Sequence, residues 1–424
     1  MYPGSGEAAG TNFNPREQSL HGYRFVEGEE NTIENTASSS AVINSIVTVP
    51  GIVVPLVVFP GQSMPFLATC PQGDMIPHFV KHARSDFPFI VAIPGDPSHG
   101  IEDVVMPEDP EEEVEDTPPN ALFENKTPKR ATLLQIRSFC EKADIPDVIH
   151  FEAIAKHRVR IIELNMETKI YAGRIHMAFF KKVIVEILPE PDFDNRLGDF
   201  RGYYCHIVPV NFLKRRNAEN DSMLQAITPI SPELMRRTQL GETFREMEKL
   251  MKQRFENKYV SFQDYSTTEK SFWLARNIPF DTSARLKLLN EDQPIIRLVE
   301  IMKLATRIQA ICCANCMNRL SDEKEWNCFM STEGASAIFV NPGGILHDVI
   351  FAFGAAHDGI HFVGRPSFEY SWFDGYGWSC ARCAHCFEYV GWKFTSERYR
   401  PECFFAFTRR AVMPEYETVV EPEL

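Results

Sequence analysis

The chain has 424 residues, of which 44% are hydrophobic, and a formal net charge of −14. This length and composition predict two or three domains with sizeable cores. The net negative charge argues against direct nucleic-acid binding, because phosphate recognition requires a basic face. Most of the eleven cysteines are crowded into the last third instead of being spread as a disulfide framework, which indicates a reducing compartment.

Residues 1–44 are expected to form a disordered tail, because Gly, Ser, Asn and Glu are abundant there. This stretch lacks the apolar core of a secretory signal. The chain contains no run of about 18 uninterrupted apolar residues, so we expect no membrane span.

Apolar runs rich in Val, Ile and Phe predict a β domain over residues 45–190. The first run, 52–59, ends at a Pro60-Gly61 turn that a second apolar segment follows. Further strand patterns lie at 89–93, 131–139, 151–163 and 172–188. Residues 102–116 hold nine carboxylates and two prolines. They are expected to be a solvated loop, with an acidic docking segment as the alternative.

A helical character follows over residues 191–304. Apolar residues at helical intervals predict one helix over 232–258, with Ser231 as its N-cap. Residues 272–310 predict two more helices, punctuated by Pro279 and Pro294 and capped at Asp281 or Thr282.

Residues 305–413 contain two Cys-x-x-Cys pairs, and residues 414–424 are expected to be a C-terminal tail. One pair is Cys313 and Cys316, and 66 residues separate it from the next. Two such pairs favour a tetrahedral four-thiolate zinc site, which leaves no open position for water and is therefore structural. Spacing alone allows either Cys383 with Cys386 or Cys380 with Cys383 as the second pair. Four ordinary buried cysteines are the alternative.

Three of the five tryptophans, Trp372, Trp378 and Trp392, fall within 21 positions. Glycines between the first two predict a turn, so their indoles face each other across a bend. Trp392 and Phe394 alternate in a following strand and share one face. Three indoles beside a zinc site form either a core cluster or a flat-walled cage for a ligand ring, and the residues alone leave both open.

The motifs of this region occur in a characteristic order. They are Val340-Asn341-Pro342, Gly364-Arg365-Pro366-Ser367, Ser371-Trp372-Phe373, Gly375-Tyr376, Trp378, the second Cys-x-x-Cys and Gly391-Trp392-Lys393-Phe394. This pattern resembles the thalidomide-binding domain of the cereblon family, from about Cys313 to Arg410. In that family the second zinc pair begins five residues after the middle cage tryptophan, which selects Cys383 and Cys386.

The resemblance implies one structural Zn²⁺ and a cage for a glutarimide or another cyclic imide. The implied zinc ligands are Cys313, Cys316, Cys383 and Cys386. The implied cage residues are Trp372, Trp378 and Trp392 as walls, Phe394 as the floor, and Tyr370, Asn341, Pro342 and Tyr376 around the rim.

Three positions depart from the family pattern. Tyr370 replaces a histidine, Cys380 replaces a β-branched apolar residue, and Gly343 stands where the family often has a histidine. The family binds the imide mainly through backbone groups near the first of these positions. The substitutions therefore alter the rim of the cage and leave ring binding expected.

The opening strand with its Phe-Pro-Gly turn looks like a Lon N-terminal domain over about residues 45–190. No Walker-type loop is present, and proteolysis is not implied. Together the resemblances imply an α+β multidomain protein: a Lon-like β domain, a helical segment and a C-terminal zinc-bound all-β domain.

The cereblon resemblance further implies a non-catalytic substrate receptor of a cullin-RING ubiquitin ligase in the cytoplasm and nucleus. The helical segment would dock on the ligase's β-propeller adaptor, of the damaged-DNA-binding type, and substrate proteins and cyclic-imide molecules would be further partners. A helical bundle that only joins the two β domains is the alternative for that segment.

Two other functions are open for the zinc domain. Its architecture is similar to that of B-type methionine sulfoxide reductases, for which Cys403 would be the catalytic thiol. An aromatic cage also binds methylated ammonium groups, with Glu369 or Asp374 as the accompanying carboxylate. His385 lies inside the second cysteine pair and is an alternative metal ligand.

Overall fold

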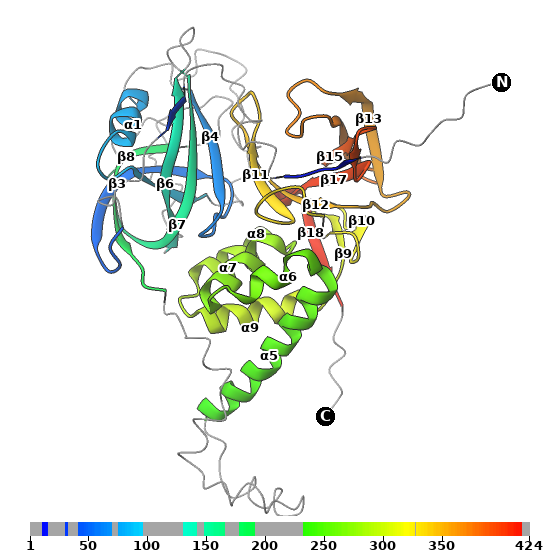
Figure 1. The fold of residues 1–424 in the computed structure, drawn as a ribbon, viewed down its shortest axis with the longest axis horizontal. Coiled ribbons are helices and arrows are strands. Elements are labelled where there is room, and N and C mark those ends of the chain that lie inside the picture. Colours follow the sequence, from blue (N-terminus) through cyan, green and yellow to red (C-terminus); the bar gives the residue numbers. More distant parts are fainter. Residues whose placement is uncertain are drawn as a thin grey trace, which may run out of the picture. The chain divides into compact units, whose positions relative to one another are not determined.

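The computed structural model describes residues 11–15, 30–32, 41–69, 75–95, 130–141, 148–165, 178–190, 232–326 and 328–417. The chain divides into two compact units. The first comprises Met1–Pro189, Ala275–Asn290 and Arg307–Leu424, and the second comprises Glu190–Leu274 and Glu291–Thr306. Sheets dominate the first unit and helices the second, which confirms the predicted α+β class (Figure 1). No helix in the described ranges is long and apolar enough to span a membrane.

A seven-stranded sheet forms the N-terminal part of the first unit, in the order β2-β6-β5-β3-β8-β7-β4. Its strands are β2 (Glu30–Thr32), β3 (Ile46–Val54), β4 (Ser63–Thr69), β5 (Phe89–Pro94), β6 (Arg130–Glu141), β7 (Val148–Asn165) and β8 (Ala178–Ile187). An additional pairing of β6 with β7 closes five of these strands into a ring. Among the described pairs of this sheet, only β3 and β5 run parallel. The strands predicted at 89–93, 131–139 and 151–163 are confirmed. The strand predicted over 52–59 ends at Val54, and that predicted over 172–188 is confirmed from Ala178 to Ile187, since 172–177 lie outside the described residues.

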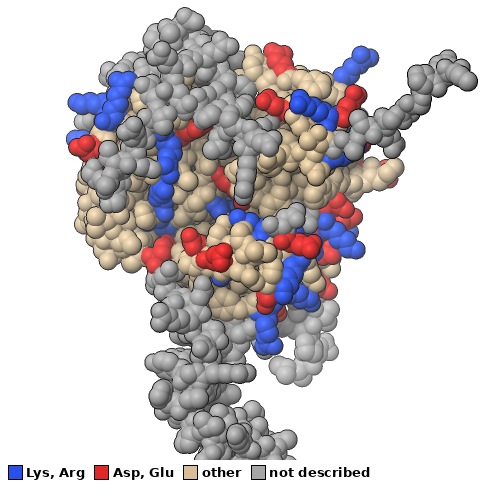
Figure 2. All heavy atoms as spheres, in the orientation of Figure 1, with Lys and Arg blue, Asp and Glu red and all other residues tan. Residues whose placement is uncertain are grey.

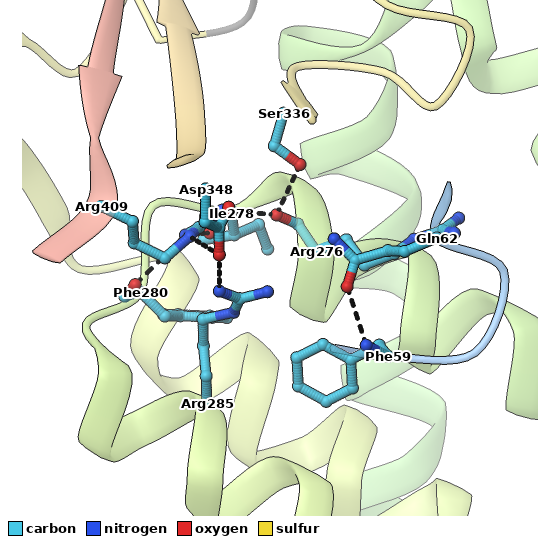
Figure 3. A network of polar contacts seen from close by, with 9 residues as sticks. All are labelled: Phe59, Gln62, Arg276, Ile278, Phe280, Arg285, Ser336, Asp348 and Arg409. Atoms are coloured by element: carbon cyan, nitrogen blue, oxygen red, sulfur yellow. Dashed lines mark hydrogen bonds and ion pairs between the residues drawn. The ribbon is translucent and has the colours of Figure 1, made fainter. Parts of the chain in front are cut away.

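The predicted turn at Pro60-Gly61 is confirmed between β3 and β4. Gly61 has a φ of +85°, a conformation that favours glycine. The side chain of Gln62 accepts a hydrogen bond from the backbone N–H of Phe59 at 2.7 Å, which closes the turn (Figure 3). The acidic stretch 102–116 lies outside the described residues.

Alternate residues of β3 enter different cores, as the strand's period of two requires. Ile52 and Val54 belong to one apolar cluster and Val53 to another. Helix α1 (Met75–Ala83) adds Phe79 to the first of these clusters. Both faces of the sheet are therefore buried at this strand.

Residues 11–15 require a correction to the predicted disordered tail. Strand β1 (Thr11–Asn12) pairs in parallel with β16 (Tyr399–Arg400). The ring of Phe13 makes edge contacts with Phe373, Tyr376 and Tyr399 at centroid distances of 5.5–6.0 Å. Strand pairing and the ring of Phe13 thus anchor this stretch, which its polar composition did not predict.

The second unit contains α5 (Pro232–Arg254), α6 (Glu256–Gln263), most of α7 (Thr267–Asn277) and α9 (Pro294–Ala305). The single helix predicted over 232–258 is instead two helices, because Phe255, between α5 and α6, leaves helical geometry with φ −132° and ψ 43°. Its buried ring packs edge-on against Trp273 at 5.1 Å. The predicted cap Ser231 lies outside the described residues.

The two helices predicted over 272–310 are corrected to three. Helix α7 ends at Asn277, α8 (Thr282–Asn290) follows Pro279, and α9 begins at Pro294. The predicted cap of α8 is confirmed, since Asp281 Oδ1 accepts a hydrogen bond from the Ala284 N–H at 2.9 Å. Residues 308–310 belong to a strand instead.

Arg409 ties the end of α7 to the C-terminal sheets (Figure 3). Its Nη1 donates to the carbonyls of Ile278 and Phe280 at 2.9 and 3.2 Å, and its Nη2 donates to that of Arg276 at 2.8 Å. Its Nε donates to Asp348 at 3.2 Å. These carbonyls lie at and just after a helix C-terminus, where a cation is favoured.

The C-terminal part of the first unit holds a six-stranded and a three-stranded sheet. The six-stranded sheet has the order β11 (Ser336–Val340), β12 (Leu346–Ala352), β17 (Cys403–Thr408), β15 (Tyr389–Thr395), β14 (Gly377–Cys383) and β13 (Ile360–Ser367). The three-stranded sheet has the order β10 (Arg319–Asp322), β9 (Ile308–Cys313) and β18 (Val412–Tyr416). Strand β18 thus continues past residue 413, into the predicted tail.

Strand β11 separates two cores. Ile338 and Val340 point into a cluster of the seven-stranded sheet, whereas Phe339 joins the aromatic core of the six-stranded sheet. That aromatic core also contains Phe351, Trp372, Phe373, Tyr376, Phe394 and Phe404. Neighbouring residues of one strand therefore connect the packing of the two sheets.

Basic and acidic side chains are interspersed on the face of the molecule drawn in Figure 2. Among the described residues on that face, they form no continuous basic surface. The predicted lack of direct nucleic-acid binding remains a prediction.

Candidate functional site

Two similar hairpin tips carry the four predicted zinc ligands. Cys313 ends β9, and Cys383 ends β14. In each hairpin, the N–H of the residue after the second cysteine, Met317 or Phe387, bonds to the carbonyl of the first cysteine at 2.9 or 3.0 Å. Both residues have a φ of 60°. The two Cys-x-x-Cys sequences therefore adopt the same local turn.

The structure brings Cys313, Cys316, Cys383 and Cys386 together, and we call them the cysteine cluster. Their four sulfurs lie within 4.8 Å of one another. Cys313 and Cys386 are 3.6 Å apart, and Cys316 and Cys383 are 3.5 Å apart, between Sγ atoms. A tetrahedron with Zn–S bonds of about 2.3 Å has S···S edges of about 3.8 Å. The cluster therefore fits one metal ion.

Two thiols of this cluster have pKa values shifted in opposite directions. Burial raises the pKa of Cys313 to about 12, whereas the backbone N–H of Glu388 lowers the pKa of Cys386 to about 6. Cys380, the alternative partner by spacing, lies outside the cluster and pairs across the strands with Trp392. His385 is exposed and is also outside it.

Trp372 and Trp392 contact each other directly. Their ring centroids are 4.5 Å apart with the planes at 71°. Phe394 lies 6.3 Å from Trp372, and Phe339 stacks on the other side of Trp372 at 4.6 Å. The indole Nε1 of Trp372 donates to the carbonyl of Val340 at 3.2 Å. This hydrogen bond and the stacking hold the Trp372 ring in one orientation.

Trp378 lies on the same face of the sheet as Phe394, directly across β14 and β15. Its indole Nε1 donates to the carbonyl of Glu369 at 2.8 Å. Trp378 and Trp392 are half-buried, whereas Trp372 and Phe394 are buried. The three tryptophans, which the sequence predicts to form a cage and which are called the tryptophan cage below, thus comprise one buried ring and two partly accessible rings.

The predicted rim residues occupy different surroundings. Asn341 closes a turn, accepting the Ile345 N–H on its Oδ1 at 2.8 Å, and Pro342 at that turn is exposed. Tyr370 is 57% exposed with a φ of 54°. Tyr376 is buried, and its hydroxyl donates to the Pro401 carbonyl at 2.8 Å.

The rings around Tyr376 are those of the aromatic core, not of the cage. Its described ring contacts are with Phe13, Phe373, Tyr399 and Phe404. Burial also raises its pKa. In the structure Tyr376 is therefore a packing residue of the aromatic core.

No protein-family model matches the chain. Curated relatives named Protein cereblon are each 33% identical to it: 149 residues in Danio rerio, 146 in Gallus gallus and 156 in Xenopus tropicalis. These matches cover 34–36% of this chain and 32–34% of the relatives. Over the matched residues the chain is similar to these cereblon proteins.

The match spans about a third of the length of the cereblon proteins it was found in. A solved structure titled N terminal domain of Mycobacterium avium complex Lon protease aligns with 61% of this chain and 97% of its own. That alignment has 11% sequence identity and a TM-score of 0.33.

His347, on β12, lies against the cage and was not predicted there. Its ring centroid is 4.9 Å from that of Trp392 and 5.6 Å from that of Trp372. Burial, together with the charge of Arg410, lowers the pKa of His347 to about 4, so the ring is neutral at pH 7. Among the described residues, neither ring nitrogen has a hydrogen-bond partner.

Tyr389 was also missed. Its ring lies 5.3 Å from that of Trp392, although the two residues are three apart on one strand. Strand alternation puts such residues on opposite faces. A register shift between Ala381 and Arg382, opposite this stretch, breaks the alternation. The sequence shows only a glycine at this point, Gly391, a residue type typical of bulges. In the structure its φ is 142°.

The residues of the two alternative functions are also located. Cys403 begins β17 opposite Thr395, and burial raises its pKa. A raised pKa disfavours the thiolate that a nucleophilic cysteine requires. Glu369 and Asp374 are exposed, and the described hydrogen bond between Glu369 and the cage uses its carbonyl.

Proposed function

We propose that this chain is the substrate receptor of a cullin-RING ubiquitin ligase and carries no catalysis of its own. In this proposal the tryptophan cage binds a cyclic imide, either in a small molecule or at the C-terminus of a protein. The bound protein is thereby presented for ubiquitination in the cytoplasm and nucleus. The similarity to cereblon over a third of the chain supports this assignment.

The observation that carries the proposal is the arrangement of the three indoles. Trp372 is fixed by its bond to the Val340 carbonyl, and Trp378 by its bond to the Glu369 carbonyl. Trp392 meets Trp372 nearly edge-on at 4.5 Å. Indoles held by backbone acceptors offer flat surfaces at little entropic cost, which suits a planar ring.

Apolar burial of the ligand ring alone does not supply the binding free energy of a micromolar complex. Burying about 150 Å² of a ring at about 25 cal/mol/Å² contributes roughly 4 kcal/mol. Micromolar affinity requires about 8 kcal/mol. Hydrogen bonds to the imide in a dry site supply the remainder. Backbone groups and the neutral ring of His347, which offers one donor and one acceptor, are suited to this role.

The cysteine cluster would hold one Zn²⁺ with a structural role. Four thiolates saturate a tetrahedral ion, so no position remains for an activated water. The ion joins the β9–β10 and β14–β15 hairpins. It thereby fixes the start of β15, which carries Trp392. Zinc binding supports the shape of the cage, and the imide does not contact the metal.

The helical unit would bind the ligase's β-propeller adaptor of the damaged-DNA-binding type. It exposes a charged helix surface, with Lys252 and Glu248 paired one turn apart on α5. Co-purification of the full chain with the adaptor, or its absence, tests this part separately from imide binding.

The decisive experiment is titration of a glutarimide into the full, zinc-loaded chain, followed by tryptophan fluorescence. Wild-type protein should show saturable micromolar binding, and Trp378→Ala should lose it. Trp273→Phe is the matched control, because Trp273 is an indole of the helical unit and binding should persist. Absence of binding to a zinc-loaded wild-type chain would overturn the imide assignment.

Competition identifies the ligand class. A trimethyl-lysine peptide should not displace the glutarimide, since the cage's described contacts include no carboxylate. Displacement at equal concentration would favour a methyl-ammonium reader instead.

A further inference from the structure

Cys380 is a thiol that the proposed function leaves without a role. It stands on β14 and lies outside the cysteine cluster. Among the described cysteines outside that cluster, Cys380 and Cys403 are the partly exposed ones, whereas Cys140, Cys312 and Cys328 are buried. A partly exposed thiol is open to reagents, so the surroundings of Cys380 decide which reagents reach it.

The sheet register places Cys380 between two walls of the tryptophan cage. On β15, Trp392 is its direct cross-strand partner, and the Cβ atoms of such partners are about 4.5–5.5 Å apart. On β14 itself, Trp378 is two residues away, so both side chains point to the same face at a separation of about 7 Å. The thiol and the two indoles therefore share one surface.

A polar side chain in contact with the cage lacks a partner. His347 is 7% exposed, and its ring lies against those of Trp372 and Trp392, at centroid distances of 5.6 and 4.9 Å. Within the described part of the chain, neither of its nitrogens has a hydrogen-bond partner. Buried polar groups nearly always have one. This second feature, which is independent of the thiol, indicates that the cage receives a ligand with polar groups.

Cys380 is not reactive by itself. Burial raises the pKa of its thiol, and the nearby charge of Arg382 offsets only part of that rise. A thiol with a raised pKa carries little thiolate at pH 7, and the thiolate is the nucleophile. Free electrophiles in solution should therefore modify Cys380 slowly. An electrophile held beside the thiol by the cage would react through proximity instead, since a bound reactant has a high effective concentration.

We propose that Cys380 is a covalent attachment site for cyclic imides that carry a Michael acceptor on the ring. This role rests on the imide-binding function proposed above. The imide ring occupies the cage, and the β-carbon of an acrylamide substituent reaches the Cys380 sulfur. The sulfur adds to that carbon, the π bond of the acrylamide C=C breaks, and the thiol proton ends on the neighbouring carbon. The product is a thioether, and the step needs no oxidant and releases no group.

The probe is a glutarimide that bears an acrylamide on the ring carbon next to a carbonyl, incubated with the full, zinc-loaded chain. Intact mass should show a single adduct, and peptide mapping should place it on Cys380. The labelling rate should saturate with probe concentration, exceed that of plain acrylamide by about a hundredfold, and fall when unsubstituted glutarimide is added. A rate that stays linear in probe concentration and is unaffected by glutarimide would overturn the proposal.

Cys403→Ser is the matched control. Cys403 is also partly exposed, and burial raises its pKa as well. Its neighbour on β17, Phe404, packs in the aromatic core, so strand alternation puts Cys403 on the other face of the sheet. Its variant should keep the labelling rate at Cys380, and Cys380→Ser should lose the label. Adducts on Cys403 at the same rate as on Cys380 would show reaction without guidance by the cage and contradict the site.

The outcomes separate covalent attachment from reversible imide binding. Reversible glutarimide binding with no adduct on Cys380 would overturn the attachment site and leave the cage as an imide site, whereas absence of both would overturn both. Adducts on the cysteine cluster with loss of zinc would also contradict the site. If Cys380→Ser does not fold, protection of Cys380 by glutarimide in wild-type protein decides, because that measurement needs no variant.

Discussion

The seven-stranded sheet buries mainly aliphatic side chains, whereas the six-stranded sheet buries mainly rings and ends at a cysteine cluster. Aliphatic packing is non-directional, and its contribution follows the buried area. Aromatic packing adds preferred angles, and the indoles also make hydrogen bonds, such as that of Trp372 to Val340. Directional contacts fix the orientation of individual rings. This difference supports the proposed ligand cage on the six-stranded sheet.

The largest expected effect comes from removing the metal. Cys383→Ser should eliminate metal binding and with it stabilisation on the order of 10 kcal/mol. Hydrogen exchange should then lose protection in β9, β10, β14 and β15, while β6 and β7 remain protected. Mass spectrometry of exchange and metal analysis measure both outcomes.

Cys380→Ser is the control for this variant and resolves the ambiguity of spacing. Cys380 lies outside the cluster, so its variant should keep one metal ion per chain. Equal metal content in Cys383→Ser and wild type would show that the cluster is not the metal site. Loss of protection throughout both sheets would show that they unfold together.

Arg409→Met should be next in size. It leaves three carbonyls at the end of α7 without their charged donor and removes one partner of Asp348. Breaking a buried ion pair from one side costs about 3–5 kcal/mol. Chemical denaturation should show this loss, and the exposed neighbour variant Arg410→Met should change stability by less than about 0.5 kcal/mol. Equal losses of stability in Arg409→Met and Arg410→Met would show that the Arg409 hydrogen bonds do not stabilise the fold.

Acidification should act on the six-stranded sheet through His347. Its pKa is about 4 when folded and near 6.5 in an unfolded chain, so between these values the unfolded state binds more protons. The contribution is fully present above about pH 6.5 and decreases as the pH falls toward 4. Between pH 7 and 5 the loss is about 2 kcal/mol.

His347→Phe should therefore reduce the pH dependence of the unfolding free energy by that amount, as measured by denaturant titration at both pH values. His361→Gln, a change at an exposed histidine on β13, should leave it unaltered. An unchanged slope in His347→Phe would mean that the imidazole is not held neutral.

The smallest effects should be equal in the two regions. Arg160 and Glu186 pair across β7 and β8, and Arg319 and Glu415 pair beside β9. These arginines are about half exposed, and exposed pairs contribute about 0.2–1 kcal/mol. Arg160→Ala and Arg319→Ala should each lower stability by no more than this in urea titrations. A larger loss of stability in only one variant would show that surface charge stabilises one region more than the other, which the comparison of the two cores does not predict.

Local patterns in the sequence predicted the strands, the α8 cap and the proximity of the cysteine pairs. The strand and cap signals lie within a few residues of each other, and the repeated Cys-x-x-Cys spacing marks two remote pairs as ligands of one metal. The break at Phe255 escaped prediction because a tertiary contact with Trp273 overrides the helical pattern. The contact of Tyr389 with Trp392 also escaped prediction, because a register shift opposite this stretch breaks the strand alternation.

Long-range polar contacts were beyond the sequence pattern. Asp348 meets Arg285 and Arg409 from 63 and 61 positions away. Charged residues are normally read as surface, and nothing local marks these three as buried. The same limit explains why His347 was not assigned to the cage.

Strand β11 constrains how related sequences can diverge. Ile338 and Val340 serve one core, and Phe339 serves the other. Inserting or deleting one residue within the strand would exchange these assignments and place the ring on the aliphatic side. Related sequences should therefore differ in length in the turn at 341–345 and not within 336–340. A substitution on one face of the strand should occur together with substitutions in the core that this face contacts.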